Sequence, residues 1–322
     1  FLIRWRKKIT IFPLVIFPVL LYFIPISEIE RSLIKDDKLN LRVVQPNISQ
    51  DDKWDRSLFQ DHIEKLLSLS TNDEKDLLVI WPEVALTVYL NENKELIDYL
   101  KKKLGKNIIL ITGGLRRDIK ENESKIYNSI YLINDNKLMS YEKRRLVPFG
   151  EFIPIKSILN MLKITPGETD FSIGEKERLI SFEYQNRKIN FEPSICYEAI
   201  FQTFNSKDIS ILVNITNDAW FGETTGPKQH LTATIFRAVE KGIPLIRSAN
   251  SGISVITDKS GKIIKKLDQG QTGFIEAEII LRQNSTFFMK NKEKSIFLLI
   301  FFIFFLNLVI YLITKKRKDL KN

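Results

Sequence analysis

The chain has 322 residues, of which 44% are hydrophobic and 27% charged, so it is too apolar for a disordered protein and long enough to bury a large core. Its single cysteine excludes an internal disulfide, and one cysteine with two histidines offers too few ligands for a structural zinc site. The formal net charge is +10, but the basic excess lies in residues 4–8 and 315–321, at the two tips. We therefore expect no nucleic-acid partner.

Two uncharged apolar runs lie beside these basic tips. Residues 9–27 contain three prolines, which kink or break helices, and we expect residues 1–27 to be the end of a larger membrane region. Residues 295–314 are twenty residues without a charge, the length of a helix that crosses a bilayer. Basic residues favour the cytoplasmic side of a membrane. The pattern predicts a periplasmic domain over residues 28–294, attached to a bacterial inner membrane, and a cytoplasmic tail over residues 315–322.

Strand-like and helix-like segments alternate between the two apolar runs. Strand-like runs occur at residues 41–44, 77–81, 108–112, 129–133, 188–191, 209–215, 245–248 and 253–257. Several of them are continuous apolar runs, as expected for strands buried on both faces. Helical patterns lie at residues 55–69, 92–104, 198–205 and 227–241. Strands that alternate with helices predict a layered α/β fold in one large domain.

Three side chains that can carry chemistry follow strand-like runs: Glu83 comes after residues 77–81, Lys143 after a run at residues 137–141, and Cys196 at the end of a strand. Side chains at the carboxyl ends of strands line the usual crevice of an open α/β sheet. A glutamate can take the proton of a thiol, and a lysine can stabilise a thiolate or an oxyanion. The pattern makes Cys196 a candidate nucleophile, although a lone cysteine is more often a small buried hydrophobe.

The motifs around these residues resemble a known family. LVIWPE, YEKRRLVPFGEFIP and SICYE carry Glu83, Lys143 and Cys196 in an order similar to the Glu–Lys–Cys signature of the nitrilase superfamily. Within that superfamily the chain resembles the apolipoprotein N-acyltransferases, through the motifs QPNISQDDKWD, NDAWFG, GPKQH and RAVEKGIPLIRSANSG. The resemblance runs from about residue 40 to residue 280 and includes the C-terminal apolar run.

This resemblance implies an αββα sandwich with flanking transmembrane helices. It implies Cys196 as the nucleophile, Glu83 as the general base and Lys143 as the stabiliser of the oxyanion. Supporting roles are implied for Glu151, Tyr197 and Glu198. The segment 149–164 is implied to form a lid at a lipid entrance, with substrate or lid residues Trp54, Phe149, Trp220 and Phe221.

The resemblance also implies a reaction. An acyl chain would pass from a phospholipid, expected to be phosphatidylethanolamine, through a Cys196 thioester to the N-terminal amine of a diacylated apolipoprotein, without a metal or organic cofactor. Two other interpretations stay open. A membrane-tethered amidase of the nitrilase type would use the same residues but pass the acyl group to water. A non-catalytic membrane scaffold would have no use for all three residues.

Overall fold

The computed structural model describes residues 38–71, 76–120, 123–135, 137–152, 170–175, 179–201, 208–281 and 286–319. The chain forms two compact units. One unit is Asp36–Thr286, and the other combines Phe1–Lys35 with Phe287–Asn322. In the second unit, helix α7 (Phe287–Asp319) includes the apolar run at 295–314.

Two β-sheets form the centre of the larger unit. Among the described residues, the first sheet has seven strands in the order β13-β1-β2-β4-β5-β6, with β3 paired to β4. Its strands are β1 (Lys38–Gln45), β2 (Leu77–Ile80), β3 (Leu86–Tyr89), β4 (Ile108–Lys120), β5 (Glu123–Asn134), β6 (Lys137–Glu142) and β13 (Gly273–Ile280). The strands β1, β2 and β4 run parallel, and β5 and β6 continue the sheet in antiparallel fashion.

The second sheet has six described strands in the order β12-β11-β10-β9-β8-β7. They are β7 (Ile180–Tyr184), β8 (Arg187–Ile195), β9 (Ile211–Thr216), β10 (Leu245–Ala249), β11 (Ser254–Thr257) and β12 (Ile263–Leu267). Here β8, β9 and β10 are parallel. The carboxyl ends of β8 and β9 therefore meet at one edge of the sheet.

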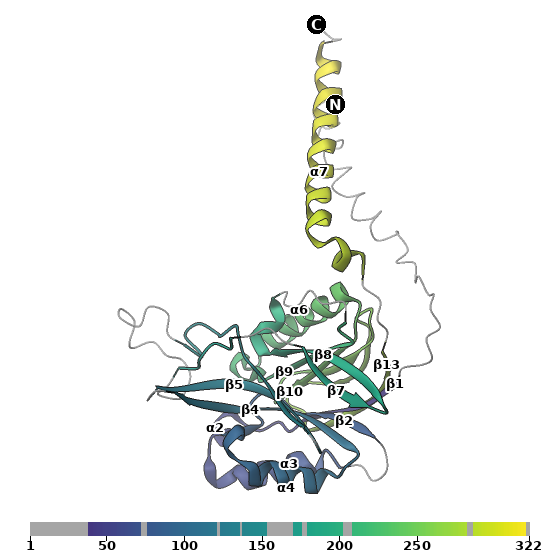
Figure 1. The fold of residues 1–322 in the computed structure, drawn as a ribbon. Coiled ribbons are helices and arrows are strands. Elements are labelled where there is room, and N and C mark those ends of the chain that lie inside the picture. The colour runs from purple at the N-terminus through teal and green to yellow at the C-terminus, as the bar shows by residue number, and fades with distance from the viewer. Residues whose placement is uncertain are drawn as a thin grey trace. The chain divides into compact units, whose positions relative to one another are not determined.

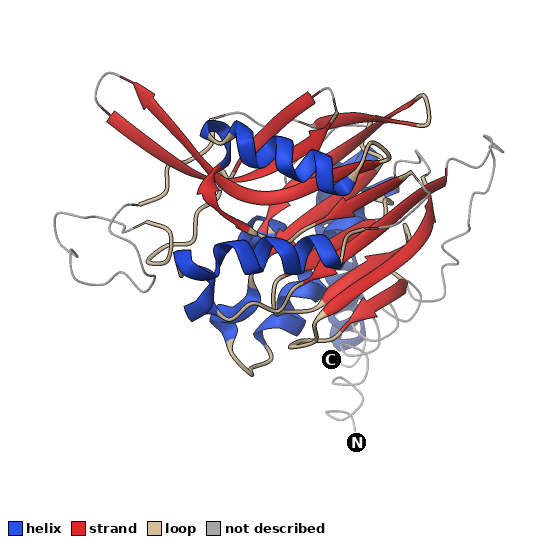
Figure 2. Cartoon of the chain, turned by 90° about the horizontal axis from the view of Figure 1, so that it is seen from below, coloured by secondary structure: helices blue, strands red, loops and turns tan. Residues whose placement is uncertain are grey.

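The helices cover the outer faces of the two sheets (Figure 1). Helices α3 (Phe59–Ser68) and α4 (Lys94–Leu104) pack on the first sheet, and α6 (Gly226–Lys241) packs on the second. In the view from below in Figure 2, α3 and α4 lie in front of the strands. Since side chains alternate along a strand, Leu78 and Ile80 of β2 enter the core between the sheets, whereas Val79 faces the helices. The result is the four-layer αββα sandwich that the resemblance implied.

Local sequence signals explain where the longer helices begin and end. The Asn93 side chain caps α4 by accepting a hydrogen bond from the backbone N–H of Leu96, and Gly105 ends the helix with φ +84°. Helix α6 has Pro227 in its first turn and ends at Gly242, whose left-handed conformation suits glycine. The remaining short helices are α2 (Gln50–Lys53), η1 (Arg56–Leu58), η2 (Leu90–Glu92), η3 (Cys196–Ile200) and η4 (Asp218–Phe221).

The structure confirms strands at all eight predicted positions, and it confirms the predicted helices at 55–69, 92–104 and 227–241 as the regions of α3, α4 and α6. The predicted α-helix at 198–205 is wrong over its described part. The chain there forms the short 3₁₀ helix η3, which ends at Ile200. A tight 3₁₀ turn fits because the side chain of Glu198 folds back to accept a hydrogen bond from the backbone N–H of Ile195.

Several predictions concern segments outside the described residues. These are residues 1–27 and positions 153–164 of the expected lid. Among the residues that the structure does describe, no helix combines the length and the apolar character needed to cross a bilayer. The predicted membrane spans are therefore not confirmed.

Candidate active site

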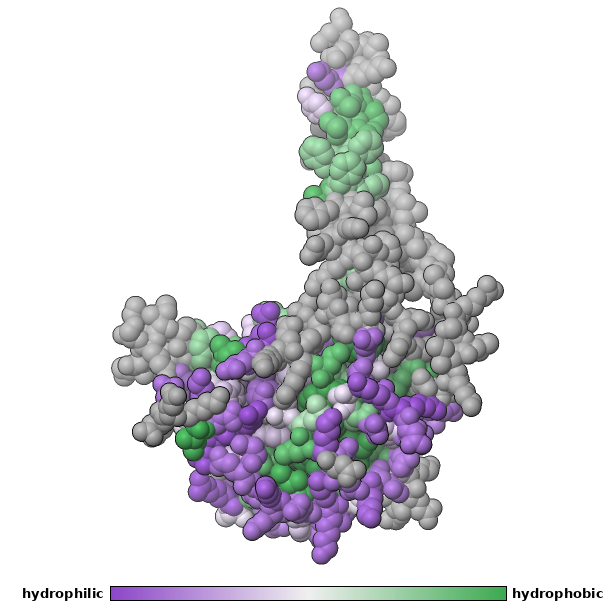
Figure 3. All heavy atoms as spheres, in the orientation of Figure 1, coloured by the Kyte–Doolittle hydropathy of each residue, from purple (hydrophilic) through white to green (hydrophobic). Residues whose placement is uncertain are grey.

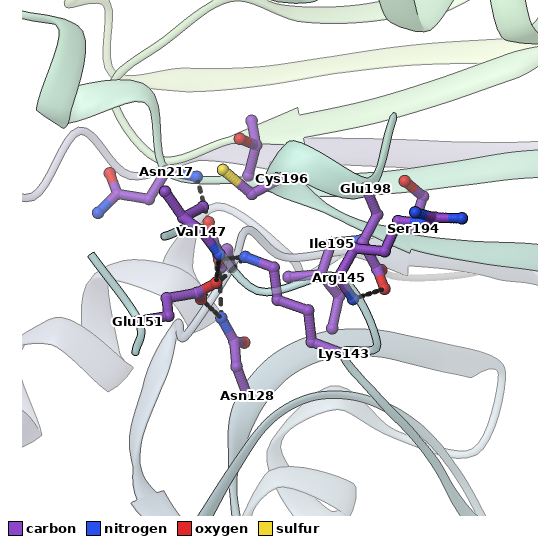
Figure 4. A network of polar contacts seen from close by, with 12 residues as sticks. Asn128, Lys143, Arg145, Val147, Glu151, Ser194, Ile195, Cys196, Glu198 and Asn217 are labelled. Carbon is purple, nitrogen blue, oxygen red and sulfur yellow. Dashed lines mark hydrogen bonds and ion pairs between the residues drawn. The ribbon is translucent and has the colours of Figure 1, made fainter. Parts of the chain in front are cut away.

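Glu83, Lys143 and Cys196 line one cavity of about 550 Å³. Glu83 lies just beyond the end of β2, Lys143 directly follows β6, and Cys196 follows β8. The first two come from one sheet and Cys196 from the other, so the packing of the two sheets brings the three side chains together. Figure 4 shows the side chains of this region.

Glu83 is buried and held by donors from three directions. Its Oε1 accepts hydrogen bonds from Asn128 Nδ2 at 2.8 Å and from Lys143 Nζ at 3.4 Å. Its Oε2 accepts from the backbone N–H of Asn217 at 2.8 Å. These contacts fix the carboxylate in one orientation at the wall of the cavity, as a general base requires.

Lys143 is 1% exposed and sits between two carboxylates. Its Nζ donates to Glu151 Oε1 at 2.8 Å as well as to Glu83. Burial alone would lower the pKa of this ammonium, but Glu151 and Glu83 outweigh burial and raise its pKa above the ordinary value. Lys143 therefore stays positively charged in the cavity.

Glu151 is fixed in its turn by two further donors. Its Oε2 accepts from the backbone N–H of Val147 at 2.9 Å, and its Oε1 accepts from Asn128 Nδ2 at 3.2 Å. Asn128 thus contacts both carboxylates that flank Lys143. In Figure 4 the amide nitrogen of Asn128 and the ammonium of Lys143 converge on Glu151. This arrangement places a fixed cation at one side of the cavity.

Cys196 has φ +48°, an unusual backbone conformation for a residue with a side chain. Such a conformation costs about 1–3 kcal/mol and recurs at functional sites. Burial and the Glu83 carboxylate raise the pKa of the thiol to about 12, although Lys143 acts in the opposite direction. The thiol is therefore protonated at neutral pH, and its activation requires a base.

Glu198 lies behind the nucleophile rather than in the cavity wall. Its Oε1 accepts from the backbone N–H of Arg144 at 2.7 Å and from the hydroxyl of Tyr141 at 2.9 Å. Its Oε2 accepts from Ile195. Burial raises the pKa of Glu198, while these hydrogen bonds act to lower it. The side chain ties the segment before Cys196 to the segment after Lys143.

Large apolar side chains surround the mouth of the cavity. Trp54, Trp220, Phe221 and Ile200 line it, and each is between 38% and 49% exposed. Tyr197 also lines the cavity, and its ring packs edge-on against Phe201. Phe149 is placed differently. Its neighbours Pro148 and Gly150 line the cavity, but Phe149 itself is not among the described lining residues.

Sequence reasoning missed three side chains at the site. Asn128 lies on β5, and its position in a strand is the only feature of the sequence that bears on its role. Lys53 is buried and donates to the backbone oxygen of Glu83 at 2.8 Å, and burial lowers its pKa to about 8. His230 stands in the GPKQH motif, and its Nε2 lies 3.0 Å from the carbonyl oxygen of Cys196. Among the described residues, no group of three or more His, Cys, Asp or Glu side chains is placed to hold a metal ion.

One family model and several known proteins match this chain. A family model described as carbon–nitrogen hydrolase matches residues 40–284. The apolipoprotein N-acyltransferase of Rickettsia prowazekii (strain Madrid E) is 37% identical over 282 residues, which cover 85% of this chain and 56% of that protein. The apolipoprotein N-acyltransferase of Rickettsia bellii (strain RML369-C) is 40% identical over 288 residues, covering 86% of this chain and 56% of that protein. The chain therefore spans about half the length of the curated relatives it matches.

Solved structures of the superfamily share the fold. A carbon–nitrogen hydrolase superfamily protein from Xanthomonas campestris aligns with a TM-score of 0.53 at 17% identity, covering 75% of this chain and 90% of that one. A nitrilase-superfamily protein of Saccharomyces cerevisiae aligns with a TM-score of 0.54 at 22% identity, covering 78% and 92%. The predicted nitrilase-like α/β sandwich is thereby confirmed. Together with the family match over residues 40–284, this places the chain in the carbon–nitrogen hydrolase family.

Proposed function

We propose that this chain is the catalytic part of an apolipoprotein N-acyltransferase. It would move an acyl chain from a phospholipid, with phosphatidylethanolamine as the expected donor, to the N-terminal amine of a diacylated apolipoprotein. The observation that carries the proposal is the meeting of a thiol, a carboxylate and an ammonium in one cavity with an apolar rim. The names of its relatives support the choice of reaction.

In the first step, Glu83 takes the proton of the Cys196 thiol, and Sγ attacks the ester carbonyl carbon of the phospholipid. Lys143 carries three N–H donors, of which two contact Glu151 and Glu83, and the third is available to the negative carbonyl oxygen. The ester C–O bond then breaks. The leaving alkoxide takes the proton from Glu83, lysophospholipid departs, and a thioester remains on Cys196.

In the second step, the α-amine of the apolipoprotein attacks the thioester carbonyl. Glu83 takes a proton from the amine and returns it to the sulfur as the C–S bond breaks. The products are an amide and the free thiol. The same three side chains serve both steps, which predicts a ping-pong scheme with an isolable acyl-enzyme.

We propose further that the protein acts at a bacterial inner membrane, with the sandwich on the periplasmic side. Both proposed substrates carry acyl chains, and the apolar rim of Trp54, Trp220 and Phe221 offers such chains a surface to lie on. Helix α7 exposes large apolar side chains along its described part, which Figure 3 shows as a continuous hydrophobic band. These exposed side chains favour contact with lipid.

Trapping of the acyl-enzyme tests the proposed function. The chain is incubated with phosphatidylethanolamine that carries a labelled sn-1 acyl chain, and the protein is analysed by mass spectrometry. We expect a labelled, hydroxylamine-sensitive adduct on wild-type protein and none on Cys196→Ala. A diacylated lipopeptide added afterwards should remove the label as an amide. A label of equal intensity on Cys196→Ala would refute the assignment of the nucleophile.

The acceptor decides between the acyltransferase and the amidase. If labelled fatty acid appears in water at the same rate with and without lipopeptide, the acyl-enzyme is hydrolysed rather than transferred. Release of ammonia from small amides, without transfer to the lipopeptide, would support the amidase instead. A protein that forms no adduct with any acyl donor would agree with the scaffold.

A further inference from the structure

The carbonyl group of Cys196 has a specific partner in the cavity wall. Cys196 joins β8 to η3 with φ +48°, so its peptide group is turned away from the regular path of the strand. Its carbonyl oxygen lies 3.0 Å from Nε2 of His230. Because a carbonyl oxygen can only accept, His230 is the donor of this hydrogen bond. The bond ties the carbonyl group of Cys196 to a side chain of helix α6.

His230 is itself locked in place. The side chain is 6% exposed and comes from α6, the helix that covers the second sheet. Its Nδ1 lies 2.9 Å from Oδ1 of Asp218, which is 1% exposed. Asp218 also accepts from Arg247 Nη2 at 2.7 Å and from Thr216 Oγ1 at 3.0 Å. The imidazole ring therefore has little freedom to rotate or to leave the carbonyl.

The segment that fixes His230 also fixes the proposed base. Asp218 directly follows Asn217, whose backbone N–H donates to Oε2 of Glu83 at 2.8 Å. One short segment after β9 thus reaches Glu83 on one side and, through Asp218 and His230, the carbonyl of Cys196 on the other. In Figure 4 the sulfur of Cys196 points toward the side of the cluster where Asn217 lies. Nucleophile and base are therefore held relative to the same piece of backbone.

The geometry points to His230 as a positioning residue for the nucleophile. It would act through the Cys196 carbonyl, without touching the substrate, to keep Sγ at the place where Glu83 can deprotonate it and the carbonyl carbon can be attacked. This inference rests on Cys196 being the nucleophile of the proposed function. Loss of the hydrogen bond would let the peptide turn toward a relaxed conformation and carry the thiol away from Glu83.

The test follows acylation of Cys196 by p-nitrophenyl acetate, which needs neither phospholipid nor lipoprotein. Glu83 takes the proton of the Cys196 thiol, Sγ attacks the acetyl carbonyl, and the ester C–O bond breaks. Each acylated thiol releases one p-nitrophenolate. The variants are His230→Ala, His230→Gln and His230→Asn. Glutamine places an N–H donor near the position of Nε2, whereas asparagine is one methylene shorter. The two amides therefore differ in reach but hardly in polarity.

We expect the acylation rate to fall about tenfold to a hundredfold in His230→Ala and His230→Asn, because small misplacements of reacting groups cost this much. His230→Gln should keep the rate within about threefold of wild type, since one hydrogen bond to the carbonyl suffices for placement. The control Leu231→Ala removes a buried apolar side chain of the same helix that belongs to the core beneath α6. It should lower the melting temperature and leave the acylation rate unchanged.

The outcomes separate the inference from the proposed function. If wild-type protein releases no burst of p-nitrophenolate beyond that of Cys196→Ala, then Cys196 is not the nucleophile and the proposed function fails. If wild type gives a burst and His230→Asn acylates as fast as His230→Gln, the positioning role is refuted. A loss in Leu231→Ala as large as in His230→Asn would also refute it, because general destabilisation would then explain the effect. If His230→Ala fails to fold, the acylation rates of His230→Gln and His230→Asn still test the positioning role.

Discussion

The thiol of Cys196 shows how single residues at this site depend on their surroundings. Burial and the carboxylate of Glu83 raise its pKa to about 12, so thiolate is scarce at neutral pH even with a lysine nearby. A reactive cysteine more often has a lowered pKa. Here proton removal must accompany attack, and a fixed carboxylate next to the thiol can provide it.

This dependence predicts the effect of removing the base. Glu83→Gln keeps the size of the side chain but cannot accept the proton, so the rate of Cys196 acylation should fall by about a hundredfold to ten-thousandfold. Single-turnover mass spectrometry with a labelled acyl donor measures the rate. The control is Glu95→Gln, an exposed position in the first turn of α4, which should not alter it. Equal acylation rates in wild type and Glu83→Gln would exclude Glu83 as the general base.

A second residue-scale prediction concerns acid stability. Asp218 is buried, and although burial opposes the charge, Arg247 and His230 lower its pKa from 3.8 to about 2. A carboxyl group whose pKa is lower in the folded protein than in the unfolded chain stabilises the folded state at pH values above its unfolded-state pKa. This stabilisation is lost as the pH falls through the folded-state pKa. The contribution is about 2 kcal/mol. The difference in unfolding free energy between wild type and Asp218→Asn should therefore shrink by this amount as pH falls from 4 toward 2, measured by urea denaturation. A constant difference would contradict the prediction.

The residues that sequence could find are those inside distinctive motifs. Glu83, Lys143, Cys196 and Glu151 stand in motifs that resemble a family, and the structure places all four at one cavity. Asn128 carries no comparable signal, because its role depends on two carboxylates that come from other strands and loops. The contact between His230 and Cys196 depends on how α6 packs over η3, which a sequence pattern does not contain.

At the scale of elements, the turn after β2 depends on a close approach to β4. Gly113 donates from its backbone N–H to the carbonyl of Pro82, directly before Glu83. A Cβ at Gly113 would lie 2.3 Å from the backbone nitrogen of Val84. Since backbone cannot yield as a flexible side chain does, the turn that carries Glu83 would have to move.

Gly113→Ala should therefore lower the free energy of unfolding by about 1–3 kcal/mol and slow acylation of Cys196. The matched control is the next residue, Gly114, where a Cβ would lie 3.5 Å from the ring of Tyr131, an ordinary contact. Gly114→Ala should be close to wild type in both measurements. Chemical denaturation of the two variants measures the free energy of unfolding, and the burst of p-nitrophenolate measures the rate of Cys196 acylation. Equal behaviour of the two alanine variants would show that the close approach has no effect.

Three of the strands that escaped prediction share a physical reason. Strands β7, β12 and β13 lie at or near the edges of their sheets, and β12 is largely exposed. Edge strands need not be continuously apolar, so the pattern that revealed β2 does not apply to them. Helix η3 was overestimated because helical spacing in the sequence cannot distinguish a full α-helix from one 3₁₀ turn closed by Glu198.

At the scale of the whole molecule, helix α7 presents apolar residues where a water-exposed helix would carry polar ones. Phe304 lies near the middle of the apolar run at 295–314 and is 66% exposed. An arginine at the centre of a bilayer-inserted helix costs about 2.5–3.5 kcal/mol. If α7 inserts into lipid, a charge at this position will weaken the insertion.

If α7 inserts into lipid, Phe304→Arg should shift the full chain from lipid vesicles toward the aqueous phase by about a hundredfold in partition coefficient. Ile119→Arg is the matched control, because Ile119 has the same exposure of 66% but lies on β4 of the sandwich. It should leave the partition unchanged. Flotation of the protein with vesicles of phosphatidylethanolamine and phosphatidylglycerol provides the measurement. Equal flotation of Phe304→Arg and wild type would exclude insertion of α7.

The left-handed backbone conformation of Cys196 has one more consequence, for the stability of inactive variants of this protein. Glycine adopts φ +48° without the steric penalty that alanine or cysteine meets. An inactive Cys196→Gly protein should therefore melt at a higher temperature than an inactive Cys196→Ala protein. Glycine thus fits this backbone position better than cysteine but has no thiol. Selection for stability alone would therefore remove the nucleophile.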